Sequence, residues 1–119
     1  MSLVEIKVFE DSFWAIVLGT TGDTDYLRIG ELVVLLFKET EVSIGKNLNG
    51  LISLRNRFKS KIKEIRGGKL LSSLTLDYHG IDVGSVISTR STTTMDLKIG
   101  ETVEWLVKTN EITLSKVNR

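Results

Sequence analysis

Apolar and polar residues alternate in short runs along most of the chain, which is the pattern of half-buried β-strands. Three such runs follow one another at residues 52–65, 70–78 and 81–87. Gly67-Gly68 separates the first two runs and His79-Gly80 separates the second and third, and both pairs are typical of tight hairpin turns. The pattern therefore predicts three consecutive antiparallel strands in this part of the chain.

A polar stretch at residues 88–97 follows the third predicted strand, and we expect roughly one helical turn within it. A break at residues 98–101 leads to two short apolar runs at 102–107 and 111–114, which are joined by a turn at 108–110. The resulting order, three strands, a helix and two strands, is that of a small OB-like barrel. The predicted fold class is all-β, an OB-like five-stranded barrel with one short helix.

The chain also contains an internal repeat at an offset of 70 residues. Residues 26–46 match residues 96–116 without a gap, and the shared positions include Gly30-Glu31 and Gly100-Glu101. Chance similarity between two β-rich segments is the alternative, but the ungapped length and the repeated Gly-Glu favour duplication.

The first copy begins where residue 71 of the second copy lies, so it lacks the opening strand. We therefore expect a truncated first module at residues 1–48, a complete second module at 49–119, and a linker at Asn47–Gly50. A truncated module leaves a strand edge open, and modules of this size bury little surface, so the sequence predicts a homo-oligomer, a dimer or a trimer.

Composition narrows the possible functions. The chain has 119 residues, a net charge of +1, no cysteine and a single histidine, His79. These values exclude disulfides and thiolate sites, make a metal centre unexpected, and give no overall attraction to nucleic acid or to an anionic membrane. No apolar run approaches the ~20 residues that cross a bilayer, and no signal-peptide pattern is present, so we expect a cytoplasmic protein. No nucleophile–base pair or carboxylate dyad is discernible, and we do not expect an enzyme.

Hydrogen-bond donors that suit a tetrahedral dianion gather where the predicted strands of the second copy end. Such an anion has no proton to donate, so it requires hydroxyls, backbone amides and one or two cations. The donors form three pairs, on the first strand, in the loop before the helix and at the last turn: Ser53 and Arg55, Ser88 and Ser91, Lys108 and Thr109.

These segments resemble a known family. Residues 53–62, which begin Ser-Leu-Arg-Asn, are similar to the opening strand of the molbindin module (the Mop or TOBE domain), which reads Ser-Ala-Arg-Asn followed by an aromatic residue. The loop at residues 86–91, the Leu97-x-x-Gly100-x-x-Val103 spacing and the turn at 108–109 match the module in the same order. The resemblance covers residues 50–117 well and 3–46 in part. The tandem arrangement is similar to double-module molbindins and to the effector domain of molybdate-responsive regulators.

The resemblance implies a function and a site. It implies reversible binding of molybdate or tungstate for intracellular storage, buffering or sensing, without a cofactor, at sites formed between subunits. The oxyanion-binding residues that it implies are Ser53, Arg55, Ser88, Ser91, Lys108 and Thr109. The first copy departs from this pattern, because Leu18 replaces Ser88 and Glu39 replaces Thr109, although Thr21 and Lys38 are retained.

Other interpretations remain open. The chain could be the effector module of a molybdate-responsive regulator or transporter, although it has no P-loop and no helix-turn-helix pattern. Cations alternate from Arg55 to Lys63. All of them except Arg55 could protect an edge strand from aggregation, or the row could line a nucleic-acid groove in which Phe58 and Tyr78 stack on bases. The Ser/Thr run at residues 88–94 could simply cap a helix.

Overall fold

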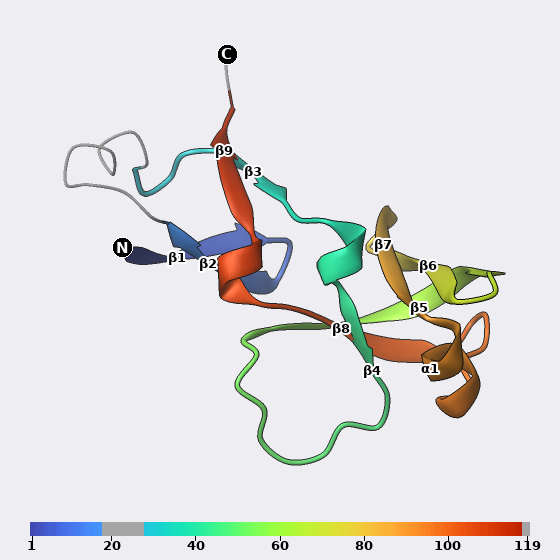
Figure 1. The fold of residues 1–119 in the computed structure, drawn as a ribbon. Helices are drawn as coiled ribbons and strands as arrows, with labels where there is room; N and C mark the ends of the chain where they lie inside the picture. The colour runs from blue at the N-terminus through green and yellow to red at the C-terminus, as the bar shows by residue number, and fades with distance from the viewer. Residues whose placement is uncertain (18–27, 118–119) are drawn as a thin grey trace.

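The computed structural model describes residues 1–17 and 28–117, which fold almost entirely into β-strands (Figure 1). The only α-helix of the described residues is α1 (Thr89–Thr94). The strands and the two 3-10 turns of this part are β1 (Ser2–Val8), β2 (Asp11–Val17), β3 (Val33–Leu36), η2 (Glu39–Glu41), β4 (Ser43–Gly45), β5 (Asn56–Gly67), β6 (Leu71–Tyr78), β7 (Ile81–Ser88), β8 (Thr102–Val107), η3 (Thr109–Glu111) and β9 (Thr113–Lys116). The predicted all-β class with one short helix is confirmed.

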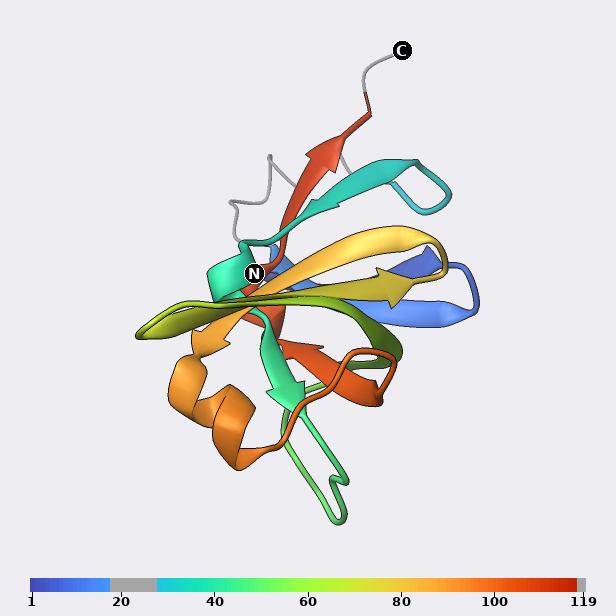
Figure 2. The same ribbon diagram turned by 90° about the vertical axis from the view of Figure 1, so that its right-hand side faces the viewer.

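A five-stranded antiparallel sheet in the order β4-β8-β5-β6-β7 forms the main part of the molecule. Its central strand β5 pairs with β8 through residues 56–61 and with β6 through residues 61–67. Because the long strand changes partner along its length, the sheet curls into a half-barrel (Figure 2). This curled sheet agrees with the predicted OB-like architecture.

Strand β5 differs from its prediction in two respects. It begins at Asn56 rather than at Ile52, so Ser53 and Arg55 precede the strand instead of sharing one of its faces. It also lies inside the sheet, so its alternating cations do not protect an edge strand, as one interpretation held. One of these cations, Arg57, forms an ion pair with Glu104 of the neighbouring strand β8.

The hairpin between β6 and β7 forms as the sequence predicts. His79 and Gly80 have φ angles of 51° and 85°, the left-handed pair that a two-residue turn of the primed type requires. The end of the chain differs slightly from the prediction, because η3 takes up residues 109–111 and the last strand starts at Thr113 rather than at Glu111.

The last strands of the two repeats are exchanged. Strand β4 of the first repeat pairs with β8 of the second, and β9 of the second pairs with β3 of the first. The two ladders have the same register at the offset of 70 residues, since Leu36 opposite Thr113 corresponds to Leu106 opposite Ser43. The 3-10 turns also contact the opposite repeat, since η2 of the first repeat packs on β7 of the second and η3 of the second packs on β2 of the first. The halves are therefore related by an approximate twofold axis.

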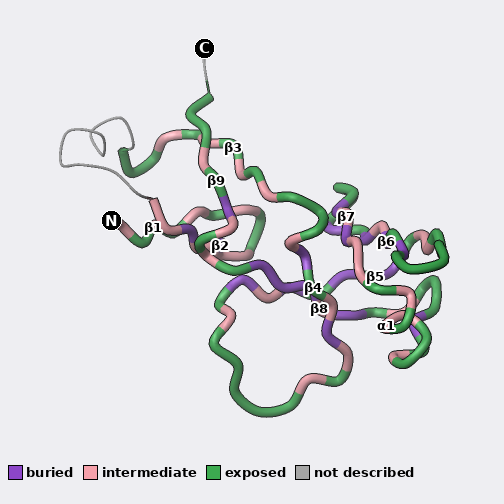
Figure 3. Tube along the Cα trace, in the orientation of Figure 1, coloured by how far each residue is buried: buried purple, intermediate pink, exposed green. Residues whose placement is uncertain are grey.

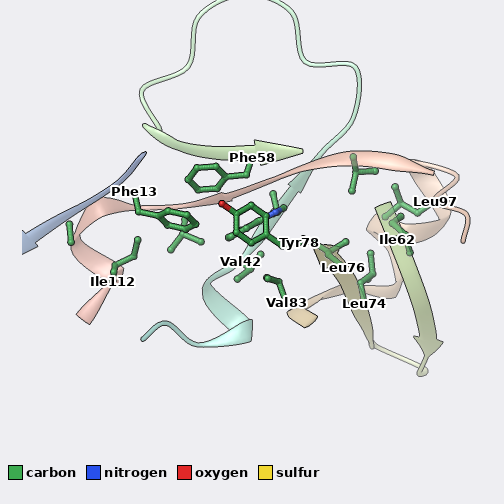
Figure 4. Close-up of a cluster of buried hydrophobic side chains, with 14 residues drawn as sticks. Phe13, Val42, Phe58, Ile62, Leu74, Leu76, Tyr78, Val83, Leu97 and Ile112 are labelled. Atoms are coloured by element: carbon green, nitrogen blue, oxygen red, sulfur yellow. The ribbon is translucent and has the colours of Figure 1, made fainter. Parts of the chain in front are cut away.

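One hydrophobic core joins the two halves, as the buried segments in Figure 3 indicate. At its centre Phe13 of β2 stacks on Phe58 of β5 with ring centroids 4.1 Å apart, and Tyr78 lies beside them (Figure 4). The Trp105 ring completes the cluster. Trp105 is 1% exposed, which agrees with the packing role that its sequence position predicts. Because the cluster draws on both repeats, neither repeat has a separate aromatic core.

Candidate functional site

Asn56 fixes the segment that carries Ser53 and Arg55. Its side-chain Oδ1 accepts a hydrogen bond from the amide of Trp14 at 2.7 Å, and its Nδ2 donates to the carbonyl of Trp14 at 2.8 Å. The amide of Asn56 thereby pairs with β2 as a neighbouring strand would, and it is completely buried. The segment just before β5 is consequently held at the junction between the two repeats.

Arg55 lies directly over this junction. Its guanidinium carbon is 4.5 Å from the centroid of the Trp14 ring, a distance at which cation–π attraction is significant. The guanidinium is otherwise exposed, so its hydrogen-bond donors are accessible. Asn56 is opposite Val107 in the last pair of the antiparallel β5–β8 ladder. Arg55 and Lys108 are the residues that follow this pair beyond the end of the ladder.

Ser53 and Lys108 line one pocket of about 380 Å³ at the same junction. Lys108 is the residue before η3, and η3 packs against β2, so the turn of Lys108 and Thr109 lies beside the strand that holds Trp14. Of the six predicted residues, Ser53 and Lys108 line this pocket. Arg55 lies over Trp14 and Thr109 begins η3, but neither of them is a lining residue of the pocket. The Ser53 hydroxyl and the Lys108 ammonium are donors of the kind that bind a tetrahedral anion.

Two carboxylates also line the pocket of Ser53 and Lys108. Glu41 and Glu111, which correspond to each other at the offset of 70, both line it. A side-chain hydrogen bond with Glu41, supported by partial burial, raises the pKa of Glu111, and Lys108 opposes this shift. When both carboxyls are ionised, the pair disfavours an anion in the pocket, so the charge on this pair influences anion affinity.

The structure places Ser88 and Ser91 elsewhere. Ser88 caps α1, because its Oγ accepts from the Ser91 amide at 3.1 Å, and the two hydroxyls are 2.8 Å apart. Neither residue lines the pocket of Ser53 and Lys108. The helix-capping interpretation of this segment thus describes their contacts within one chain, and the pocket lacks these hydroxyls unless another subunit supplies them.

In the first repeat, Leu18 and Thr21 correspond to predicted site positions, and both lie outside the described residues. Lys38 and Glu39 are described, and they precede and begin η2. Glu39 lies over Gly84, where an added Cβ would come within 2.8 Å of the Glu39 Oε2. An acidic side chain here argues against an anion site equivalent to the one at η3.

Sequence reasoning missed Trp14, Asn56 and the pair Glu41 and Glu111 as site residues. Asn56 was contained in the Ser-x-Arg-Asn motif, and the motif alone could have identified it. Trp14 reaches the junction through its contact with Asn56, and Glu41 and Glu111 precede the two exchanged strands, so neither placement follows from a local sequence pattern.

The structure does not support the nucleic-acid interpretation, because the two aromatic residues expected to stack on bases are buried. Phe58 and Tyr78 are 7% and 4% exposed and belong to the core, so neither presents a face to a base.

Among the described residues no cluster of three or more metal-ligating side chains occurs. No helix in residues 1–17 and 28–117 is long and apolar enough to cross a membrane.

Comparisons with known proteins give two informative structural matches. A cytoplasmic molybdate-binding protein described as ModG, solved with molybdate bound, superposes with a TM-score of 0.82 over 91% of this chain and 78% of its own, at 22% sequence identity. A molybdate-binding protein from Sporomusa ovata is 33% identical, with a TM-score of 0.55, and the match covers 56% of this chain and all of that protein. No protein-family model and no curated protein sequence matches the chain.

Proposed function

Because the chain belongs to the molbindin family of Mop-type modules, here in a tandem arrangement, we propose that it binds molybdate or tungstate reversibly in the cytoplasm. The protein would serve as a store, a buffer or a sensor of the oxyanion. The function is binding and not catalysis. The observation that supports the proposal best is the pocket at the junction, which both Ser53 and Lys108 line.

The chemistry of this junction suits a dianion that accepts hydrogen bonds at every oxygen. Ser53 and Thr109 offer hydroxyls, while Arg55 and Lys108 supply two positive charges. The Trp14 ring contacts the Arg55 guanidinium, which reduces the side-chain entropy that would be lost when an anion binds. A charge-assisted contact of this kind contributes about 1.5–3 kcal/mol.

We propose further that the site is completed in a homo-oligomer, a dimer or a trimer. The pocket in one chain lacks Ser88 and Ser91, which lie at α1. If a neighbouring subunit brings these hydroxyls to the junction, then the anion binds the assembled state and stabilises it by mass action. Light scattering during dilution tests this, since molybdate should preserve the oligomer at concentrations where the free protein dissociates. A monomer with full molybdate affinity would contradict it.

Titration calorimetry against four anions tests the proposed ligand. Molybdate and tungstate should bind far more tightly than phosphate, because phosphate at neutral pH is partly protonated and would direct a hydrogen toward a donor. Sulfate carries the same charge but is smaller, so it should bind more weakly through poorer fit. Equal affinity for phosphate and molybdate would contradict the proposed function.

A further inference from the structure

Among the described residues, no strand of the first repeat corresponds to β5 of the second. In the second half β5 lies between β6 and β8. The counterparts of those two strands are β1 and β3, and among the described residues no strand lies between them. Their facing edges therefore keep backbone groups that an added strand could pair with.

A pocket marks the place where the central side chain of such a strand would sit. Phe58 of β5 packs against Phe13, Tyr78 and Trp105 (Figure 4). The counterparts of these three residues at the offset of 70 are Val83, Val8 and Leu35. All three line one largely apolar pocket of about 380 Å³, which shares no lining residue with the pocket of Ser53 and Lys108. The pocket is thus the position in the first half that corresponds to the site of Phe58 in the second half.

Charge at one end of this pocket fits the residues that precede Phe58 in β5. Arg55 lies over Trp14, and the counterpart of Trp14 is Gly84. The Glu39 carboxylate lies over Gly84 and also lines the pocket. A cation placed as Arg55 is placed in the other half would therefore meet a carboxylate, and the Asn56 counterpart would lie beside the Gly84 backbone.

We propose that β1, β3 and this pocket form an acceptor groove for an extended strand of another polypeptide with the pattern Arg-Asn-x-aromatic. The strand adds antiparallel to both β1 and β3, as β5 does to β6 and β8. Its aromatic residue lies opposite Leu35 and fills the pocket, while its arginine pairs with Glu39. Backbone hydrogen bonds give this addition its affinity, and the aromatic and the arginine give it specificity.

The outer surface of β3 supports a protein occupant. Leu32, just before the strand, and Val34 and Leu36 within it are 61%, 45% and 51% exposed, and Leu36 also lines the pocket. Their counterparts in the second half are Thr102, Glu104 and Leu106, of which Leu106 is buried. An exposed apolar row beside an open strand edge is the character of a surface that another chain covers.

A peptide with the sequence of residues 53–63 of this chain is a suitable probe, because it carries the proposed pattern. Fluorescence anisotropy with the labelled peptide and the full chain should show saturable binding. A peptide with alanine in place of the phenylalanine should bind about 30-fold more weakly, which corresponds to ~2 kcal/mol for a buried aromatic anchor. A peptide with N-methylated backbone amides should not bind, since it cannot extend the sheet.

The variant Glu39→Gln identifies which half of the molecule takes the peptide, because the counterpart of Glu39 in the other half is Thr109. It should weaken the arginine peptide several-fold and leave a peptide with alanine at that arginine unchanged. Glu39 is exposed, so this variant should fold normally.

The proposal would be overturned by no peptide binding, by equal binding of the phenylalanine and alanine peptides, or by equal effects of Glu39→Gln on the arginine and alanine peptides. Comparable binding of N-acetylphenylalaninamide would also overturn it, because the pocket would then take a small apolar molecule rather than a strand.

Discussion

Asn56 satisfies both backbone hydrogen-bonding groups of Trp14 with a single buried side chain. This contact joins the opening of the second repeat to β2 of the first, across 42 residues of sequence. It also holds Arg55 in position over the Trp14 ring. One amide therefore links the assembly of the two halves to the geometry of the proposed anion site.

The substitution Asn56→Ala should destabilise the protein by about 2–4 kcal/mol, because it leaves a buried amide and a buried carbonyl without partners. Urea denaturation followed by tryptophan fluorescence measures this loss. Asn49→Ala is the matched control, since Asn49 is exposed in the segment between β4 and β5 and should change stability little. Equal effects of the two substitutions would contradict the proposed role of the amide.

Arg55→Ala should reduce molybdate affinity about tenfold or more, because it removes a charge-assisted contact from the junction. Lys61→Ala is the control, since Lys61 is an exposed cation farther along β5 and lies away from the pocket. Calorimetry on both variants gives the comparison. Equal losses would mean that the row of cations on β5 acts as a diffuse field and that Arg55 has no special contact.

The Glu41 and Glu111 pair predicts that anion affinity rises as pH falls. The pKa of Glu111 is raised above its ordinary value of 4.5, so the folded protein holds this proton at a pH where a free glutamate has lost it. As pH rises through the folded pKa, the pocket gains negative charge, and both anion affinity and the stabilising contribution of this proton are lost. Calorimetry between pH 5 and 8 should therefore show the tightest binding at the acidic end.

Glu111→Gln should increase molybdate affinity at neutral pH and flatten this dependence, because it removes the charge that titrates. Glu101→Gln is the contrasting variant, since an ion pair with Lys46 lowers the pKa of Glu101 and this carboxyl lies outside the pocket. An unchanged pH profile in Glu111→Gln would show that other groups control the anion.

Two ion pairs related by the approximate twofold axis should differ in strength. Lys46 and Glu101 are 2.7 Å apart and about a quarter exposed, and Lys46 also donates to the carbonyl of Met95 at 2.9 Å. The corresponding pair, Lys116 and Glu31, is 3.4 Å apart with a more exposed lysine. Lys46→Met should cost about 1 kcal/mol and Lys116→Met less than about 0.5 kcal/mol. Thermal unfolding of the two variants at low and high salt measures the difference, and equal costs would contradict it.

The sequence predicted the strands of the second repeat well, because glycines mark the hairpin turns. His79-Gly80 forms its turn as predicted, whereas Gly67 is the last residue of β5, neither Gly67 nor Gly68 has a positive φ, and the first turn falls between Gly68 and Leu71. The start of β5 was misplaced because residues 52–55 are apolar enough to continue a strand. Their position instead depends on the contact of Asn56 with Trp14, a partner far away in the sequence.

The candidate site was predicted in part for the same reason. The residue types at Ser53, Arg55, Lys108 and Thr109 could be chosen from the motif and from their places at predicted strand ends. Their meeting with Trp14, Glu41 and Glu111 depends on which strand pairs with which. Hydrophobic periodicity specifies the face that a strand buries, but two repeats of one pattern offer the same face to either partner.

The exchange of β4 and β9 between the repeats has a kinetic consequence. Strand β3 can complete its ladder only when β9, about 80 residues later in the chain, has been synthesised, so this ladder should close after the local hairpins have formed. During that interval the exposed edge of β3 can accept β9 from a neighbouring molecule as readily as its own. Refolding at high protein concentration should therefore trap interlinked chains, which dilution after folding would release only as fast as the native state unfolds.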